Sequence, residues 1–379
     1  MSSRITFVVA HDAYLKGARN IARTVQERCH IRWLTTSPLL VDEQISLLDM
    51  DSSEGIELLA DSDQIFVGLG GRDLNRLIRQ LRTDTGSCAE IIGFFPGILH
   101  LQILESLATR LLCDRVLLNS PRDFELYRRL AEATLGYNNG VLLGAPWITT
   151  EEVISEPDID WLFVEQSVVP QSLAERTQLA EKLYQLAATT PQQAFVVALR
   201  ARKGQASSHQ PEHCIEELCH SVCGSLPNLH FAVDDIDRLL VRTSVVATIS
   251  SSVAFTSLAR GQSTLFVDDF GIQRLYGNDL FVDSGCMQSI GYSGSLHPSE
   301  QWRNQYVLSM NVDAVAGLIT DGSRLQEHKE NAIPRVSYKN IALMKVITAY
   351  LISHGFWRWP EVGKMISSIK NINQHIYHS

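Results

Sequence analysis

Three consecutive serines form the most chemically suggestive run in this chain. Ser250, Ser251 and Ser252 lie between a β-branched run, residues 245–249, and a short helical stretch, residues 253–260. A turn at the carboxyl end of a parallel strand directs hydroxyl groups and the free N–H groups of the next helix towards one point, which suits a phosphate or a carboxylate. The alternative is an ordinary helix N-cap, because serine is a preferred capping residue.

A group of cations leaves the end of another predicted strand, residues 195–199. Arg200, Arg202 and Lys203 are followed by a glycine-containing loop that reaches His209. Guanidinium and ammonium groups bind phosphate through charge-assisted hydrogen bonds, and a histidine adds a further donor. The alternative is a solvated basic loop. Because this loop and the serines follow strands of the same predicted domain, we expect them at one edge of one sheet.

Apolar strand-like runs alternate with amphipathic helical stretches, which is the pattern of parallel sheets with helices on both faces. Six strands are predicted in the first half, at residues 5–10, 31–35, 64–68, 90–94, 115–118 and 141–143. Five are predicted in the second half, at residues 161–165, 195–200, 229–233, 245–249 and 264–267. We therefore predict an α/β protein of two Rossmann-like domains that face a central cleft, with ligands at the carboxyl ends of the strands.

The length of 379 residues exceeds what one hydrophobic core usually holds, which also favours two domains. The predicted domains are residues 1–155 and residues 156–335, joined within the polar stretch 149–160. Residues 336–379 are predicted to form helices that cross back to the first domain.

The formal net charge of −9 argues against a nucleic-acid partner. The apolar start of the chain is too short for a signal peptide or a membrane span, and seven cysteines without a CxxC pair indicate reduced thiols. The sequence therefore predicts a cytoplasmic protein. Cys214, Cys219 and Cys223 lie near histidines, but their helical spacing predicts a buried apolar stripe, and no metal site is expected.

The histidine and the serines together resemble bacterial glycosyltransferases of the GT-B architecture, and within them the sialyltransferases and Kdo transferases, which use CMP-activated acidic sugars. That group carries a His-Pro motif and, further along the chain, a Ser-Ser or Ser-Thr motif. Here His209 precedes Ser250 by 41 residues, and Pro211 follows the histidine after one inserted residue. Residues 163–166 and 255–269 also resemble the corresponding regions of such transferases.

The resemblance implies transfer of a sugar, such as sialic acid or a related acidic sugar, from a CMP-linked donor to a glycan hydroxyl. The acceptor is a glycan or a lipid-linked glycan, as in bacterial cell-envelope polysaccharide synthesis, and no cofactor besides the nucleotide sugar is expected. It further implies that His209, Ser250 and Ser251 contact the donor phosphate. The second domain would then hold the donor and the first domain the acceptor.

An inverting transferase also needs a base for the acceptor proton, and we expect it on the first domain. His11 and Asp12 directly follow the first predicted strand, and Asp73 follows the third. The structural alternatives are helix N-caps for Asp12 and Asp73, and a packed turn residue for His11. Two other functions stay open at this stage: a sugar-nucleotide epimerase of the same architecture, and a sugar-nucleotide or glycan-binding protein without catalysis.

The last residues combine aromatic, basic and regularly spaced isoleucine side chains. Phe356, Trp357 and Trp359 precede isoleucines at helical spacing from Ile366 to Ile376. One interpretation is that these apolar residues cover the first domain. The other is peripheral contact with an anionic membrane, at the inner membrane face, where a lipid-linked acceptor would be found.

Overall fold

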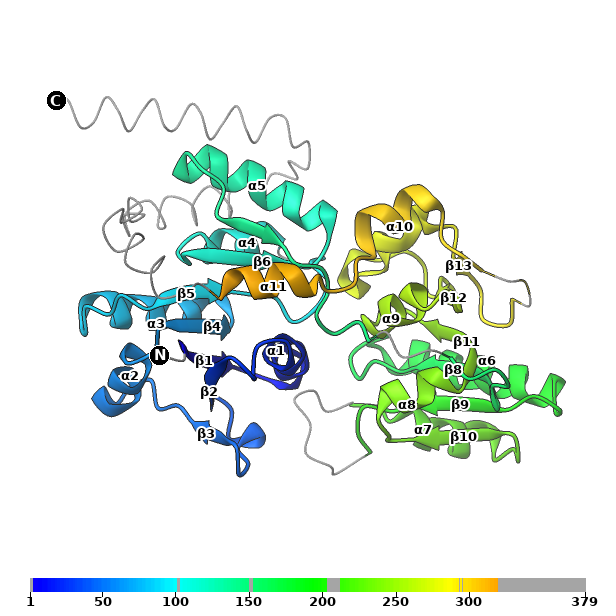
Figure 1. Ribbon diagram of the computed structural model, residues 1–379. Helices are drawn as coiled ribbons and strands as arrows, with labels where there is room; N and C mark the ends of the chain where they lie inside the picture. The colour runs from blue at the N-terminus through cyan, green and yellow to red at the C-terminus, as the bar shows by residue number, and fades with distance from the viewer. Residues whose placement is uncertain are drawn as a thin grey trace. The chain divides into compact units, whose positions relative to one another are not determined.

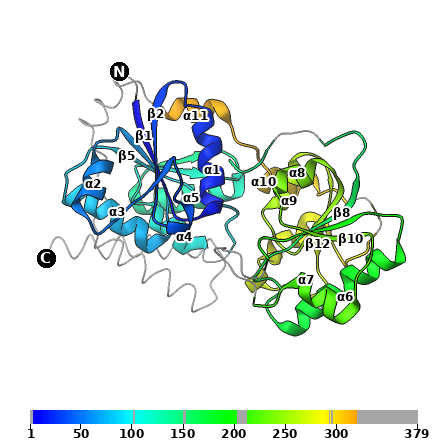
Figure 2. The ribbon, with the colours of Figure 1, turned by 90° about the horizontal axis from the view of Figure 1, so that it is seen from below.

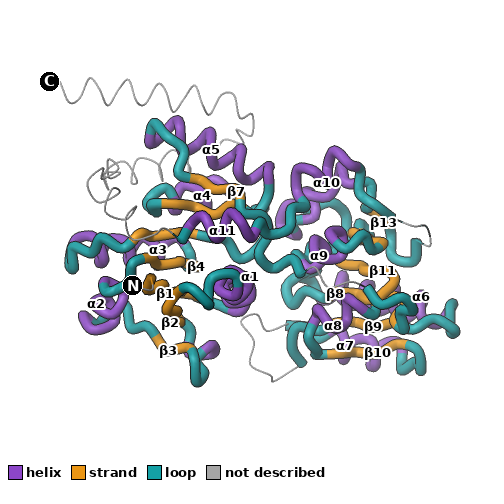
Figure 3. Tube along the Cα trace, viewed as in Figure 1, coloured by secondary structure: helices purple, strands orange, loops and turns teal. Residues whose placement is uncertain are grey.

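The computed structural model describes residues 3–100, 103–149, 153–202, 212–292, 294 and 296–319. The chain divides into two compact units, one ending at Pro146 and resuming at Met310, the other formed by residues 147–309. Each unit contains a parallel sheet packed against helices (Figure 1). Figure 3 shows the strands in orange and the helices in purple. The predicted α/β class with two Rossmann-like units is confirmed.

The sheet of the first unit has seven parallel strands within the described residues, in the order β3-β2-β1-β4-β5-β6-β7. They are β1 (Ser3–Val9), β2 (Cys29–Thr35), β3 (Ile45–Leu47), β4 (Gln64–Gly68), β5 (Glu90–Gly93), β6 (Arg115–Leu118) and β7 (Gly140–Leu142). Strands β2 and β3 lie on one side of β1, and strands β4 to β7 lie on its other side. The carboxyl ends of β1 and β4 therefore form the switch point at which sheets of this kind bind ligands.

Helices alternate with these strands and bury both faces of the sheet. They are α1 (Asp12–Arg23), α2 (Ser53–Ala60), α3 (Gly71–Thr83), α4 (Ile103–Arg110) and α5 (Pro121–Leu135), with a 3₁₀ turn at Pro38–Leu40. One core joins the sheet to α2, α3, α4 and α5, and a second core joins it to α1 (Figure 2). Because both faces are covered, the central strands β4, β5 and β6 are almost entirely buried, whereas the outer strand β2 carries the exposed His30.

The chain returns to the first unit in α11 (Val312–Leu318), which packs into the same core as α1. Val315 and Leu318 are buried there. Asn311 fixes the start of the helix, since its Oδ1 accepts from the N–H of Ala314 at 3.1 Å and its own N–H donates to the carbonyl of Leu143 at 2.7 Å. The predicted crossing helices, residues 336–379, lie outside the described residues.

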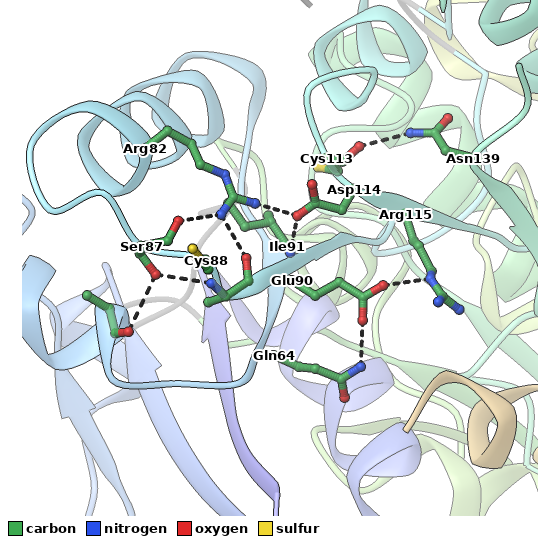
Figure 4. Close-up of polar contacts among 12 residues, drawn as sticks. Gln64, Arg82, Ser87, Cys88, Glu90, Ile91, Cys113, Asp114, Arg115 and Asn139 are labelled. Carbon is green, nitrogen blue, oxygen red and sulfur yellow. Dashed lines mark hydrogen bonds and ion pairs between the residues drawn. The ribbon is translucent and has the colours of Figure 1, made fainter. Parts of the chain in front are cut away.

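A row of polar side chains at the amino end of the sheet holds the other end of α11. The amide Nε2 of Gln64 donates to the carbonyl of Leu318 at 2.6 Å and to the carboxylate of Glu90 at 2.7 Å. Glu90 also forms an ion pair with Nε of Arg115 at 2.6 Å (Figure 4). Gln64 is fully buried, and hydrogen bonds in such dry surroundings are electrostatically stronger than in water. The returning helix is therefore tied to β4 at a defined position.

The sheet of the second unit has six parallel strands within the described residues, in the order β10-β9-β8-β11-β12-β13. They are β8 (Ile159–Val164), β9 (Phe195–Ala198), β10 (Leu229–Ala232), β11 (Thr243–Thr248), β12 (Ser263–Val267) and β13 (Met287–Gln288). Strands β9 and β10 lie on one side of β8, and strands β11 to β13 lie on its other side. The second switch point therefore lies between the carboxyl ends of β8 and β11.

The helices of this unit are α6 (Leu173–Thr189), α7 (Ile215–Leu218), α8 (Ile236–Val241), α9 (Val253–Ala259) and α10 (Glu300–Tyr306). A π-helical turn, Cys219–Cys223, extends α7, and two 3₁₀ segments, Arg274–Tyr276 and Asn278–Ser284, follow β12. The division between the units falls after Pro146, earlier than the predicted boundary after residue 155. The second unit ends at Ser309, before the predicted boundary after residue 335, because α11 already packs into the core of the first unit.

The seven cysteines are all free thiols. Cys219 is 1% exposed and donates to the carbonyl of Ala180 at 3.6 Å, and burial raises the pKa of its thiol to about 12. A thiol that stays protonated is a poor metal ligand. In the part of the chain that the structure describes, no cluster of histidine, cysteine and acidic side chains could hold a metal ion. Over the same ranges, no helix combines the length and apolar character needed to cross a membrane.

Candidate functional site

The serine run lies at the carboxyl end of β11, at the switch point of the second unit. The hydroxyl of Ser250 donates to the carbonyl of Tyr276, and the backbone N–H of Ser250 donates to Oε1 of Gln166 at 2.8 Å. The amide Nε2 of Gln166 donates back to the hydroxyl oxygen of Ser250 at 3.1 Å. Ser250 is thus held by protein groups on two sides, which makes it a support of the turn.

The other two serines differ from Ser250. The hydroxyl oxygen of Ser251 accepts from the N–H of Val253 at 3.3 Å, so this residue provides the capping bond. Ser252 occupies the N-cap position of α9, and its side chain makes no capping hydrogen bond. Among the described residues, the hydroxyl group of Ser252 makes fewer hydrogen bonds than those of Ser250 and Ser251. It is therefore the one of the three that does not help to hold the turn.

Gln166 is held in place by a buried ion pair beside it. Glu165 and Arg176 pair with side chains only 3% and 1% exposed. One guanidinium nitrogen of Arg176 also donates to the carbonyls of Gln166 at 3.2 Å and Ser167 at 3.3 Å. These hydrogen bonds hold the backbone of the loop after β8, including that of Gln166. Sequence reasoning included Gln166 in the stretch 163–166 that resembles the transferases but gave it no role; its signal is a polar residue directly after a buried strand at the switch point.

The predicted cations leave β9, which lies on the far side of β8 from β11. Two strand spacings, roughly 10 Å, therefore separate this strand end from the serine turn. Arg200 is exposed there. Arg202 forms an ion pair with Glu216 at 3.2 Å and donates to the carbonyl of Phe231 at 3.2 Å, which directs it towards α7 and β10. Lys203 and His209 lie outside the described residues.

The predicted bases lie at the switch point of the first unit, where Val9 of β1 pairs with Gly68 of β4. His11 is the N-cap residue of α1 and Asp12 is its first residue, with Nδ1 and Oδ1 3.9 Å apart. Both side chains are substantially exposed, at 41% and 53%. Asp73, in the first turn of α3, is also exposed. The structure thus brings all three to one edge of one sheet.

The N-cap interpretation of the two aspartates is wrong. Helix α1 begins after His11, and helix α3 begins after Gly70. Asp12 and Asp73 therefore stand in the first turns, where a carboxylate stabilises the positive end of a helix without capping it. The packed-turn alternative for His11 agrees with the structure in part, since its ring lies 4.6 Å from that of Tyr14, centroid to centroid.

A cavity of about 250 Å³ opens at this edge of the first unit. It is bounded by the start of α3, the loop after β5 at residues 95–100, and the inner side of α4. Tyr14, Glu105 and Arg110 are among the side chains that line it. None of the three predicted bases is among its described lining residues. Sequence reasoning missed this cavity because most of its lining comes from the loop after β5 and from α4, which the search for a base did not consider.

Gly68 allows two buried aromatic rings to approach the end of β4, and one of them, Tyr14, lines this cavity. A Cβ added at Gly68 would lie 2.5 Å from Tyr14 and 2.8 Å from Phe94, and both rings are buried. We expect Gly68→Ala to lower the free energy of unfolding by about 1–3 kcal/mol, the usual cost of overpacking a core. Urea unfolding checks this. Gly70→Ser is the control, because no atom lies within 4 Å of a Cβ at Gly70 and serine suits an N-cap; equal losses in the two variants would contradict the expectation.

A family profile described as "Putative glycosyltransferase (DUF6716)" matches residues 5–319, which include both sheets. The chain belongs to this family. A search of curated protein sequences gives no match. The GT-B-type architecture expected for a glycosyltransferase agrees with the two parallel sheets of the structure.

Solved structures share this fold over most of the chain. The Staphylococcus aureus MnaA–UDP co-structure has a TM-score of 0.52 at 10% identity, covering 92% of this chain and 97% of that one. The UDP-GlcNAc 2-epimerase of Methanocaldococcus jannaschii, in complex with UDP-GlcNAc and UDP, has a TM-score of 0.54 at 9% identity, covering 83% and 98%. A variant of the wall teichoic acid polymerase TagF has a TM-score of 0.54 at 10% identity, covering 87% and 89%. At such identities the likeness shows the fold alone, and epimerases share it with a polymerase.

Proposed function

We propose that this glycosyltransferase-family protein moves a sugar from a nucleotide-activated donor to a hydroxyl group of a glycan or lipid-linked glycan. The proposal rests on the serine turn at the switch point of the second unit, which Gln166 holds through two hydrogen bonds to Ser250. The family description as a putative glycosyltransferase supports it. The similar MnaA and epimerase structures were determined with UDP or UDP-GlcNAc, which supports a nucleotide sugar as the partner.

In this proposal the donor phosphate lies against the serine turn. Ser252 offers its hydroxyl group, while Gln166 and Ser250 keep the turn rigid. Preorganised donors stabilise the negative charge that develops on the leaving phosphate, and they need no rearrangement during the reaction. Arg200, Lys203 and His209 remain predicted donor ligands. Arg202 has a smaller part, because Glu216 already neutralises it.

The base is proposed among His11, Asp12 and Asp73 on the first unit. All three follow the carboxyl ends of strands in the first sheet, where ligands usually bind, and their side chains are exposed. A carboxylate or imidazole within hydrogen-bond reach of the acceptor hydroxyl would accept its proton. The metal-independent mechanism, the CMP-linked acidic donor, the cell-envelope role and the cytoplasmic location belong to the proposal as predictions. Peripheral membrane contact through residues 356–376 also stays a prediction, because these residues lie outside the described part of the chain.

The test of donor binding is thermal stabilisation by CMP, UDP, GDP and ADP. A nucleotide at 100 times its Kd is expected to add about 2.7 kcal/mol to the free energy of unfolding. We expect one nucleotide to stand out, and we expect Ser252→Ala to weaken its binding. A selective shift with CMP would support the sialyltransferase-like or Kdo-transferase-like donor, whereas a selective shift with UDP would replace it. No shift with any nucleotide would contradict the donor site.

A turnover assay separates the proposed activity from its two alternatives. Conversion of a nucleotide sugar without any acceptor would support an epimerase, the activity named for the similar Methanocaldococcus jannaschii structure. Nucleotide binding that is unaffected by Asp12→Asn, His11→Gln and Asp73→Asn, with no turnover in the wild type, would support a binding protein. Loss of transfer in one of these variants with retained nucleotide affinity is the expected result.

A further inference from the structure

Arg110 is an unusual side chain of the first unit, because it is a buried cation at the wall of a cavity. It is 3% exposed and lines the cavity of about 250 Å³ beside β4 and β5. Its guanidinium group donates to the carbonyls of Phe94 at 3.2 Å, Leu69 at 3.2 Å and Ser106 at 3.0 Å. It also donates to the hydroxyl oxygen of Tyr14 at 2.9 Å. Each of these acceptors is neutral.

No carboxylate of the described residues forms an ion pair with Arg110, although Arg82, Arg115 and Arg122 of the same unit each have one. Burying a charge is costly unless a charge of opposite sign compensates it. The ring of Phe95, 3.9 Å from the guanidinium carbon, offers a cation–π contact, which is a smaller and partial compensation. The positive charge of Arg110 therefore lacks a counter-ion within this part of the protein.

A second positive feature faces the same cavity. Helix α3 begins at its wall, with Gly70 as N-cap and Gly71 as first residue. The start of a helix carries partial positive charge and N–H groups without helical partners. Gly70 has no side chain to cap them. Glu105 also lines the cavity, but its side chain is exposed and its charge is therefore screened by solvent.

The cavity is large enough for more than water. One water molecule takes roughly 30 Å³ in the liquid, so about 250 Å³ corresponds to a group the size of a small ligand. We propose that this cavity binds the anionic group of a ligand, a carboxylate or a phosphate, with Arg110 as its counter-charge. Its assignment to the acceptor, which would then be an acidic or phosphorylated glycan, rests on the proposed function. The anion site itself does not.

The test is calorimetric titration of the full chain with three sugars that differ in charge. D-glucuronate carries a carboxylate, D-glucose 6-phosphate carries a phosphate, and D-glucose is the neutral control. We expect at least one anionic sugar to bind, and we expect D-glucose not to bind. The anionic sugar that binds more tightly shows whether the cavity prefers a carboxylate or a phosphate. If neither anionic sugar binds more tightly than D-glucose, the proposal is wrong.

A matched pair of variants tests the cavity without disturbing its packing. Gly70 has extended backbone geometry and open space around a Cβ, and both aspartate and asparagine are good N-cap residues. Gly70→Asp adds a negative charge at the cavity wall and should weaken anion binding by about 10- to 100-fold. Gly70→Asn also caps the free N–H groups at the start of α3 but adds no charge, so it should weaken anion binding clearly less. Equal binding by the two variants would overturn the proposal. Arg110→Gln should also abolish anion binding, and urea unfolding shows whether that variant folds.

Competition with the nucleotide separates this inference from the proposed function. With the best nucleotide of the thermal panel at saturation, the anionic sugar should still bind to the cavity. Displacement by the nucleotide would overturn the acceptor assignment and place donor phosphate at Arg110. Anion binding in a protein that binds no nucleotide would contradict the proposed transferase but support the anion site. Nucleotide binding without anion binding would contradict only the anion site.

Discussion

Replacing Arg176 with methionine is expected to lower the free energy of unfolding by about 3–5 kcal/mol, because it leaves the carboxylate of Glu165 buried without its partner. The same change removes the donor to the carbonyls of Gln166 and Ser167, so the loop after β8 loses its brace. Urea unfolding of the full chain measures the loss. The effect should greatly exceed that of an exposed pair, because water compensates an exposed charge that loses its partner.

The matched control for this prediction is Arg242→Met in the same unit. Arg242 pairs with Asp158, and their side chains are 46% and 56% exposed. Exposed pairs are worth about 0–1 kcal/mol, so this variant should unfold almost like the wild type. The double variant Arg176→Met with Glu165→Leu should recover part of the lost stability, since no unpaired charge remains. A loss in Arg176→Met no larger than in Arg242→Met would show that the buried pair does not brace the loop.

The sequence was sufficient for most of the fold because strands of a parallel sheet are buried on both faces and stand out as apolar runs. The predicted strand at residues 64–68 matches β4, Gln64–Gly68, and the one at residues 115–118 matches β6, Arg115–Leu118. The strands that were missed are β3, Ile45–Leu47, and β13, Met287–Gln288. Both are edge strands of two or three residues, too short to show a periodic pattern. The return of the chain in α11 was also placed too late, because seven residues give only a weak helical signal.

The candidate site was less accessible to sequence reasoning, because its contacts join residues far apart in the chain. The serine run could be recognised locally. Its support by Gln166 spans 84 residues and depends on β8 lying directly beside β11. The contact between Arg110 and Tyr14 spans 96 residues. Strand order decides which strand ends are neighbours, and neither composition nor periodicity specifies that order.

Gln166→Leu is expected to weaken nucleotide binding by about 10- to 100-fold, if the serine turn holds the donor phosphate as proposed. The change removes the acceptor for the N–H of Ser250 at 2.8 Å and the donor to its hydroxyl oxygen at 3.1 Å. A half-buried N–H without a partner costs about 1–3 kcal/mol, which the turn would relieve by moving. The hydroxyl of Ser252 would then lose its preorganised position, and preorganisation is what makes such donors effective.

The control is another glutamine that braces the same strand at its opposite end. Gln262 is buried, and its amide Nε2 donates to the carbonyls of Leu240 at 2.9 Å and Thr243 at 2.7 Å, near the start of β11. Gln262→Leu should cost stability of similar size, about 1–3 kcal/mol, yet leave the nucleotide affinity unchanged. Calorimetric titration with the best nucleotide, together with urea unfolding, compares the two variants. Equal losses of affinity would mean that the general stability of the second sheet, rather than the geometry of the serine turn, determines nucleotide binding.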